Sequence, residues 1–266
     1  MKQDPGINHC RLCGVATRFL WLGRLLDHDV TYWECPACSY VQTEEPFWLD
    51  QAYSEAINDS DTGIMSRNLA NARIVPIALM LMGNFRATVV DYAGGYGILV
   101  RLLRDYGIEA FWTDPYCINL VSRGFEYAEG KAGLVTAFEC FEHFIHPGQE
   151  LGRMLEIAPN VLVSTLIMPS PTPKMDDWWY YGRETGQHIG FFRVKTLKWM
   201  AEKHGKFLAT DGRGYHLFSD KPVNHMLWKV ILRSNKALPL SILRYCRSLT
   251  WTDHVKMSSP GRRGSE

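Results

Sequence analysis

The sequence predicts an α/β protein that carries a small module at its N-terminus. Two features indicate this fold. Two Cys-x-x-Cys pairs, Cys10/Cys13 and Cys35/Cys38, lie near the start of the chain, and a glycine-rich turn at 94–97 joins an apolar, β-branched run to a segment of helical periodicity. Paired cysteines at this spacing are typical of a zinc ribbon. A strand, a glycine turn and a helix in succession open a Rossmann-like sheet.

Length and composition fit one large α/β domain with an appendage. The chain has 266 residues, 46% of them apolar, and a formal net charge of +1. The charge is uneven, because residues 221–266 contain nine Lys and Arg against two acids. This asymmetry predicts a basic tail with contacts of its own.

The chain shows no pattern of a signal peptide or a membrane span. Its first six residues lack an apolar core, and the longest apolar run, 74–82, is interrupted by Pro76. That run is far shorter than the roughly 20 residues that cross a bilayer. Seven cysteines without such a signal favour thiols and metal sites over disulfides. We therefore expect a soluble, cytoplasmic protein.

The N-terminal module, 1–46, is expected to be a zinc ribbon. Segments 19–22 and 30–33 have the composition of hairpin strands between the two cysteine pairs. A module of this size buries too little surface to fold alone, so the metal stabilises it. Four thiolates leave no open position, which makes the zinc structural; a redox pair or four free thiols are the alternatives. The remaining cysteines are expected to be buried thiols: Cys117, Cys140 and Cys246.

The larger sheet is expected within 85–220, after a helical connector at 47–84. Its strands are expected at 85–92, 107–114, 133–138 and 160–165, and apolar residues after the first recur at helical spacing. The second strand ends in Asp114, which lies 17 residues beyond Gly97. Nucleotide-binding sheets place a carboxylate for the ribose hydroxyls at this position.

The glycine turn resembles the Asp-x-Gly-x-Gly-x-Gly motif of class I S-adenosylmethionine (SAM)-dependent methyltransferases. Ala93 replaces the first glycine, which fits if that position has a negative φ. The resemblance implies that the turn backbone holds the methionine part of SAM, that Asp114 binds the ribose, and that the end of the third strand flanks the adenine. The expected cofactor-binding residues are Asp91, Ala93, Gly94, Gly95, Gly97, Asp114, Phe138 and Glu139. A Rossmann-like fold without a working site is the alternative.

The likeness extends over about 87–209. Segment 137–144 resembles an E-x-x-E-H segment found in many of these enzymes, and 178–189 resembles their substrate-side loop. A zinc module joined to such a domain resembles the sugar C-methyltransferases. The E-x-x-E-H segment is similar to that of ubiquinone-type O-methyltransferases and of enzymes that 2′-O-methylate small RNAs.

Two hypotheses compete for the E-x-x-E-H segment. Glu139, Glu142 and His143 share one helical face if a helix begins here, and His188 resembles the later histidine of the metal-using groups. Together they could bind Mg²⁺ or Mn²⁺, which would lower the pKa of an acceptor hydroxyl. In the alternative without metal, Glu139 contacts the cofactor, Glu142 and His143 pack a helix, and His188 or His143 is the general base. A packed His188 without a catalytic role is a third interpretation.

Aromatic and charged residues outside the motifs complete the expected site. Trp178, Trp179, Tyr180 and Tyr181 could close over the acceptor, although core packing explains such residues equally well. Three residues of the connector could cover SAM, the last of them near the methionine carboxylate: Tyr53, Asp61 and Arg67.

The basic tail is expected to form two amphipathic helices within 221–257, split by Pro239. Docking on a membrane surface is one interpretation; packing on the domain or a dimer contact is the other. Residues 258–266 are expected to be disordered. Binding to nucleic acid is not expected, because no RNA-binding module is recognised.

The sequence thus predicts a SAM-dependent methyltransferase. Its expected acceptor is a hydroxyl or carbon of a small polar metabolite, such as a sugar or nucleotide-sugar. The alternatives are metal-assisted 2′-O-methylation of RNA, and a scaffold that binds a ligand or partner without turnover.

Overall fold

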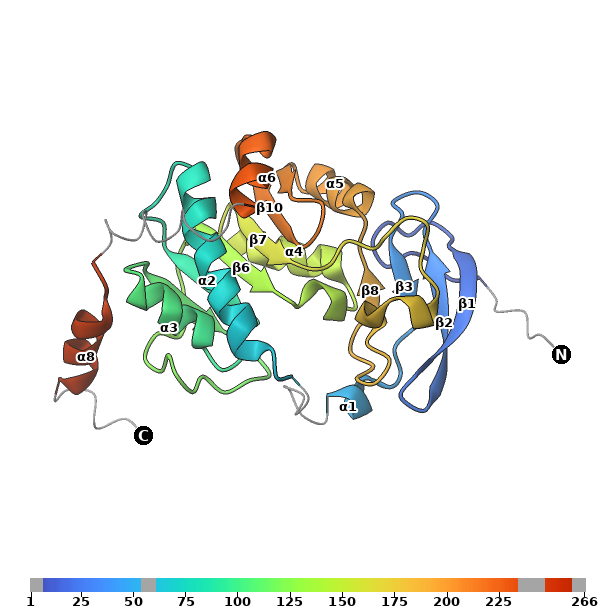
Figure 1. Cartoon of the computed structure of the whole chain (residues 1–266), viewed down its shortest axis with the longest axis horizontal. Coiled ribbons are helices and arrows are strands. Elements are labelled where there is room, and N and C mark those ends of the chain that lie inside the picture. Colours follow the sequence, from blue (N-terminus) through green and yellow to red (C-terminus); the bar gives the residue numbers. More distant parts are fainter. Residues whose placement is uncertain (1–6, 54–60, 234–246, 260–266) are drawn as a thin grey trace.

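The structure is a computed structural model that describes residues 7–53, 61–233 and 247–259. Two sheets lie side by side, with the N-terminal sheet at one end of the molecule and the last helix, α8, at the other (Figure 1). The predicted α/β class is confirmed.

The larger sheet has the strand order β5-β4-β6-β7-β10-β9 among the described residues. Its parallel strands are β4 (Val89–Tyr92), β5 (Ala110–Thr113), β6 (Leu134–Phe138) and β7 (Val161–Ser164). These four lie within the predicted strand segments. At the other edge, β10 (Tyr215–Ser219) runs antiparallel to both β7 and β9 (Phe207–Thr210).

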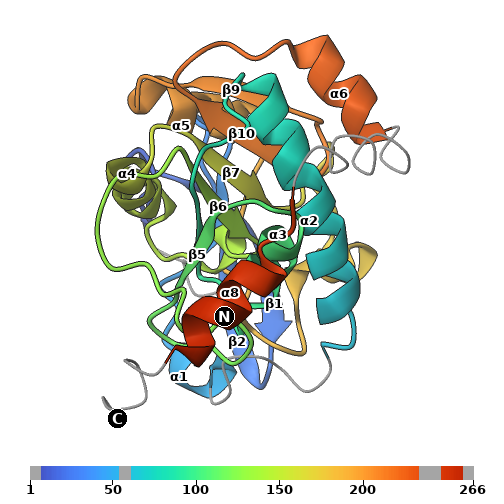
Figure 2. The same cartoon turned by 90° about the vertical axis from the view of Figure 1, so that its left-hand side faces the viewer.

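Helices cover both faces of this sheet (Figure 2). One apolar core lies between the sheet and α2 (Ile64–Leu81), α3 (Ile98–Asp105) and α6 (His225–Arg233); the other lies under α4 (Pro147–Ile157) and α5 (Val194–Lys203). Because side chains alternate along a strand, Val89 enters the first core and Val90 the second.

The smaller sheet contains the predicted hairpin, formed by β1 (Arg18–Leu25) and β2 (His28–Glu34), followed by β3 (Val41–Thr43). Its fourth strand, β8 (Gly190–Phe191), comes from far along the chain and pairs with β3. The N-terminal segment is therefore not a separate body. A short module buries little apolar surface on its own, and here it shares a core with Tyr180, Tyr181 and Phe191.

Short helical segments lie between the longer elements. They are α1 (Leu49–Ala52), η1 (Phe141–His143), η2 (Met175–Asp177) and η3 (Trp179–Tyr181). The helix that we expected to begin at Glu139 is only this single turn η1, and Glu139 precedes it with a φ of +53°.

The C-terminal helix α8 (Thr250–Ser258) packs against α3. Asp253 accepts from the Arg104 Nη2 at 2.7 Å and from the Arg101 Nη2 at 2.8 Å. Ser258, where we expected disorder to begin, is the last residue of α8. Pro239, Cys246 and residues 260–266 lie outside the described residues. None of the described helices is both long and apolar enough to cross a membrane.

Candidate functional site

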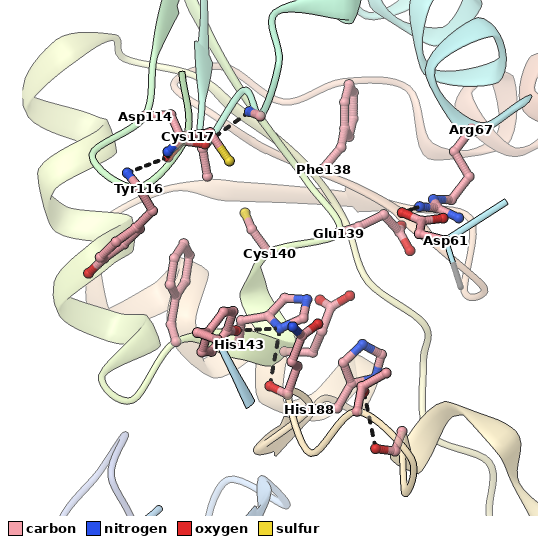
Figure 3. A pocket seen from close by; sticks show the side chains of 18 of the residues that line it. Asp61, Arg67, Asp114, Tyr116, Cys117, Phe138, Glu139, Cys140, His143 and His188 are labelled. Atoms are coloured by element: carbon pink, nitrogen blue, oxygen red, sulfur yellow. Dashed lines mark hydrogen bonds and ion pairs between the residues drawn. The ribbon is translucent and has the colours of Figure 1, made fainter. Parts of the chain in front are cut away.

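A cavity of about 1740 Å³ opens at the carboxyl ends of β4, β5 and β6. In open α/β sheets this edge is where ligands bind. The cavity is also lined by α1, by the start of α2, by η1 and by the segment 175–188. Figure 3 shows Asp114 and Cys117 on one side of it, Arg67 and Asp61 on the other, and His143 and His188 facing them.

The glycine turn after β4 needs its glycines for steric reasons. A Cβ on Gly94 would lie 2.7 Å from the Trp112 ring, and a Cβ on Gly97 would lie 2.5 Å from the Asn119 Oδ1. Gly97 also has a φ of +83° and begins α3. Ala93 has a φ of +55°, so the expected negative φ at this position is wrong. A left-handed alanine is strained, and such strain is concentrated at functional sites.

Asp114, the carboxylate that we expected to bind the ribose hydroxyls, lies at the end of β5 in the cavity wall. Its Oδ2 accepts from the Gly95 N–H at 2.9 Å, and its Oδ1 accepts from the N–H groups of Tyr116 at 2.8 Å and Cys117 at 3.0 Å. Oδ1 thus has both of its lone pairs occupied, whereas Oδ2 accepts only one bond and can accept a second. Asp114 therefore fixes the glycine turn and still has a lone pair on Oδ2 for a ligand.

Asp91 and Glu139 are carboxyls at the ends of β4 and β6 that both line the cavity. Burial raises the pKa of Asp91 to about 7, although the Thr136 hydroxyl donates to its Oδ1 at 2.7 Å. Burial also raises the pKa of Glu139, with the nearby Glu142 adding to the effect. The Ser164 hydroxyl donates to the Glu139 Oε1.

Glu142, His143 and His188 form one cluster, in which each offers a ligand atom within 4.8 Å of the others. Glu139 was predicted to join them but is not part of this group. Its left-handed backbone comes before η1, so the helical spacing on which the prediction relied is absent.

A backbone carbonyl fixes the tautomer of His188. The His188 Nδ1 lies 2.6 Å from the Tyr180 carbonyl oxygen. A carbonyl only accepts, so this Nδ1 carries a proton and the neutral ring keeps a lone pair on Nε2. The His143 Nδ1 lies 3.1 Å from the Gln187 carbonyl oxygen and 2.8 Å from the Tyr53 hydroxyl, which can either donate or accept. Burial lowers the pKa of His143 to about 3, and His188 lowers it further.

Glu142 is fully buried at the bottom of this cluster. Its Oε1 accepts from the Tyr180 hydroxyl at 2.5 Å, whereas its Oε2 has no hydrogen-bond partner among the described residues. Tyr180 thus contacts two members of the cluster. Its hydroxyl donates to Glu142, and its carbonyl oxygen accepts from His188. The sequence showed Tyr180 only as part of an aromatic run.

Comparison with known proteins identifies the family. A model described as "Methyltransferase domain" matches residues 65–206, which is more than half of the chain. The chain belongs to this methyltransferase family. Together with the glycine turn at the cavity, this confirms the prediction of a SAM-dependent methyltransferase enzyme.

Solved structures of other methyltransferases resemble the chain only distantly. The magnesium protoporphyrin IX methyltransferase of Synechocystis PCC 6803 with bound SAH is 11% identical, covering 65% of this chain and 94% of that one, with a TM-score of 0.40. An O-methyltransferase family protein from Burkholderia thailandensis is 18% identical, covering 61% and 62%, with a TM-score of 0.41. Human N-acetylserotonin methyltransferase in complex with SAM is 12% identical, covering 57% and 52%, with a TM-score of 0.42. No curated protein matches the sequence.

The four N-terminal cysteines of the methyltransferase also come together, with all four sulfurs within 4.8 Å of one another. Cys10 and Cys38 have their sulfurs 3.6 Å apart, and Cys13 and Cys35 have theirs 3.4 Å apart. A tetrahedral ion with Zn–S bonds of about 2.3 Å separates its sulfurs by about 3.8 Å. The cluster is therefore of the right size to hold a metal ion.

The aromatic run of the methyltransferase contributes to both core and cavity. Tyr180 and Tyr181 are buried and Trp179 is 78% exposed, and three of the four line the cavity: Trp178, Trp179 and Tyr180. The three connector residues predicted to cover SAM, Tyr53, Asp61 and Arg67, line the cavity as well. Of the other cysteines, Cys140 is buried as predicted, but Cys117 is only partly buried.

Proposed function

We propose that this enzyme methylates a hydroxyl or carbon of a small polar metabolite, such as a sugar, with His188 as the general base. The Nε2 lone pair of His188 supports this proposal, because the hydrogen bond from its Nδ1 to the Tyr180 carbonyl directs that lone pair away from the backbone. His188 also lines the cavity. A base placed in this way contributes roughly 10²–10⁴-fold to a rate.

SAM supplies a methyl group already activated on its sulfonium. The chain must bind it, align the acceptor, exclude water and remove a proton. The backbone at 94–97 is shaped for close approach of the methionine part, and Asp114 for the ribose. Arg67, which we expected near the methionine carboxylate, has an ion pair of 2.5 Å with Asp61. Arg67 would therefore contact the carboxylate of SAM while still paired with Asp61.

A divalent metal is a second candidate role for the cluster of Glu142, His143 and His188. The buried, unpartnered Oε2 of Glu142 favours it. Two imidazole nitrogens and one carboxylate oxygen suit Zn²⁺, Mn²⁺ or Fe²⁺ better than Mg²⁺, which prefers oxygen ligands. An ion held there would lower the pKa of an acceptor hydroxyl. In that case His188 would be a ligand and not a base.

We also propose that Cys10, Cys13, Cys35 and Cys38 bind a structural zinc. The support is the close approach of the four sulfurs and the thiolate chemistry of the donor set. Zinc would join the two ends of the N-terminal segment next to the core under α4 and α5, where three of these cysteines are buried.

Calorimetric titration with S-adenosylhomocysteine (SAH) tests the cofactor pocket first. We expect binding that Gly94→Ala abolishes, because its Cβ would overlap the Trp112 ring. Gly152→Ala, in the middle of α4 with its nearest contact at 3.6 Å, is the matched control and should bind normally. A folded wild-type protein that does not bind SAH would contradict the assignment of this cavity.

His188→Ala then tests the base, with the exposed His225→Ala as control. SAH formation in the presence of a pool of candidate acceptors should fall at least 100-fold in His188→Ala, while SAH affinity stays the same. Unchanged turnover would remove the catalytic role. Metal analysis separates the second candidate: Glu142→Gln should lose one bound metal ion if the cluster binds a metal, and none if it does not.

A further inference from the structure

The acceptor side of the cavity carries negative charge that the cofactor does not explain. We define this side as the lining residues within 49–53, 142–153 and 175–188. SAM brings a sulfonium and an ammonium against one carboxylate, together with the ribose hydroxyls, so Asp91 and Asp114 at the glycine turn already have groups of the cofactor to face. The acids on the acceptor side lie on other elements and need a separate explanation.

Every arginine among the described lining residues already has an acidic partner. These residues include no lysine and three arginines, which are Arg67, Arg153 and Arg183. Their ion pairs are with Asp61, Glu150 and Asp176 respectively. A phosphate or diphosphate entering this cavity would find no unpaired arginine among these residues.

Several carboxylates on the acceptor side, in contrast, lack a cation. Asp50, Asp177 and Glu184 line the cavity, and no basic group of the described chain lies within ion-pair distance of them. The segments that carry them are tied together. The Gln187 side chain donates to the Ala52 carbonyl at 2.9 Å, which joins the end of α1 to the loop after Glu184.

The deep end of the cavity holds the most informative carboxylate. Glu142 is fully buried, lines the cavity, and has an Oε2 without a partner among the described residues. A buried carboxylate oxygen without a donor is costly. A bound molecule that brings a donor or a positive charge would remove that cost.

Aromatic faces accompany these acids. Trp178 and Trp179 directly follow Asp177 and line the same side of the cavity, as do Tyr53 and Phe144. Aromatic rings beside carboxylates attract organic cations, since the face of each ring is negative. The same arrangement repels phosphates by like charge, and such repulsion is one source of specificity.

We propose that the acceptor is an organic cation, an amine-bearing molecule without phosphate, bound on this acidic and aromatic side. This inference rests on the proposed methyl transfer in the same cavity. It narrows the small polar metabolite to one with a positive charge and selects against nucleotide-sugars.

The test compares probes that share a ring and chain length but differ in charge. Calorimetry on the SAH-loaded enzyme, freed of loosely bound metal with EDTA, would use tyramine, the uncharged tyrosol and the anionic 3-(4-hydroxyphenyl)propanoate. Tryptamine and indole-3-propanoate repeat the comparison with a larger ring, and UDP-glucose is the phosphate probe. We expect each amine to bind at least tenfold more tightly than its uncharged or anionic counterpart, and UDP-glucose to bind most weakly.

Substitutions of the acidic residues test which of them attract the amine. The double variant Asp177→Asn/Glu184→Gln should reduce amine affinity to that of tyrosol, while Asp27→Asn, an exposed acid on the hairpin turn, should leave it unchanged. Amines that bind no better than their anionic counterparts, or that do not bind at all, would overturn the inference. Failure of SAH loading would instead contradict the proposed function, so the two failures are distinguishable.

Discussion

Asp91 should make the cofactor-free enzyme less stable as the pH rises from 5 to 8. Its carboxyl is buried, and its pKa is raised from 3.8 to about 7. The folded protein therefore keeps a proton that the unfolded chain releases at a lower pH. Between those two pKa values the free energy of unfolding falls by about 1.4 kcal/mol per pH unit because of this group. The total decrease in the free energy of unfolding caused by Asp91 is at most about 4 kcal/mol, and it is reached above pH 7.

Asp91→Asn isolates this contribution. An asparagine has nearly the shape of the protonated acid, and its side-chain oxygen can still accept from the Thr136 hydroxyl. Urea unfolding at half-unit pH steps should show the variant more stable than the wild type by about 1.6 kcal/mol at pH 5, because pH 5 already lies 1.2 units above 3.8. By pH 8 the variant should be more stable by a few kcal/mol. Parallel stability curves across this range would refute the reasoning, because they would mean that Asp91 ionises in the fold as it does in the unfolded chain.

Three further predictions concern the supports of the site. Cys35→Ser should abolish zinc binding measured by metal analysis and destabilise the N-terminal sheet, because an alcohol does not replace a thiolate ligand; unchanged zinc content would contradict the ribbon. Asp253→Ala should cost about 3–5 kcal/mol in urea unfolding, because Arg104, only 7% exposed, would lose its carboxylate partner; hydrogen exchange should show α8 released. Tyr180→Phe should cost about 1–3 kcal/mol by leaving the Glu142 Oε1 without its donor, and more than Tyr181→Phe, whose hydroxyl bonds only one carbonyl.

Local pattern predicted the central sheet well. The β-branched run before Asp91 is a buried strand, the run before Asp114 is a partly buried edge strand, and the glycine turn between them leads into a helix. A buried run of this kind can be recognised in the sequence because a strand buried on both faces is continuously apolar. The spacing of the cysteine pairs predicted that four thiols would come together, and their sulfurs do lie within 4.8 Å of one another.

What the sequence could not show depends on long-range contacts and on unusual backbone. Nothing local marks Gly190 and Phe191 as the edge strand of an N-terminal sheet that lies about 150 residues earlier. The positive φ of Ala93 and Glu139 was equally hidden, because both residue types ordinarily avoid that region. The second of these misled the prediction directly: it removed the helical register that would have placed Glu139 with Glu142 and His143.

The aromatic segment explains why the N-terminal sheet and the reactive cluster belong to one unit. Tyr180 and Tyr181 are buried in the core that β1, β2 and β3 share with β8. The same Tyr180 donates its hydroxyl hydrogen to Glu142, and its carbonyl accepts from His188. A shift of the N-terminal sheet would therefore move the two hydrogen bonds that orient the cluster. We infer that the N-terminal sheet contributes to catalysis by holding this core in place, although the proposed zinc with four thiolate ligands would have no open position for chemistry. The Cys35→Ser variant should accordingly lose turnover while any protein that remains folded still binds SAH, because the glycine turn rests on the other sheet.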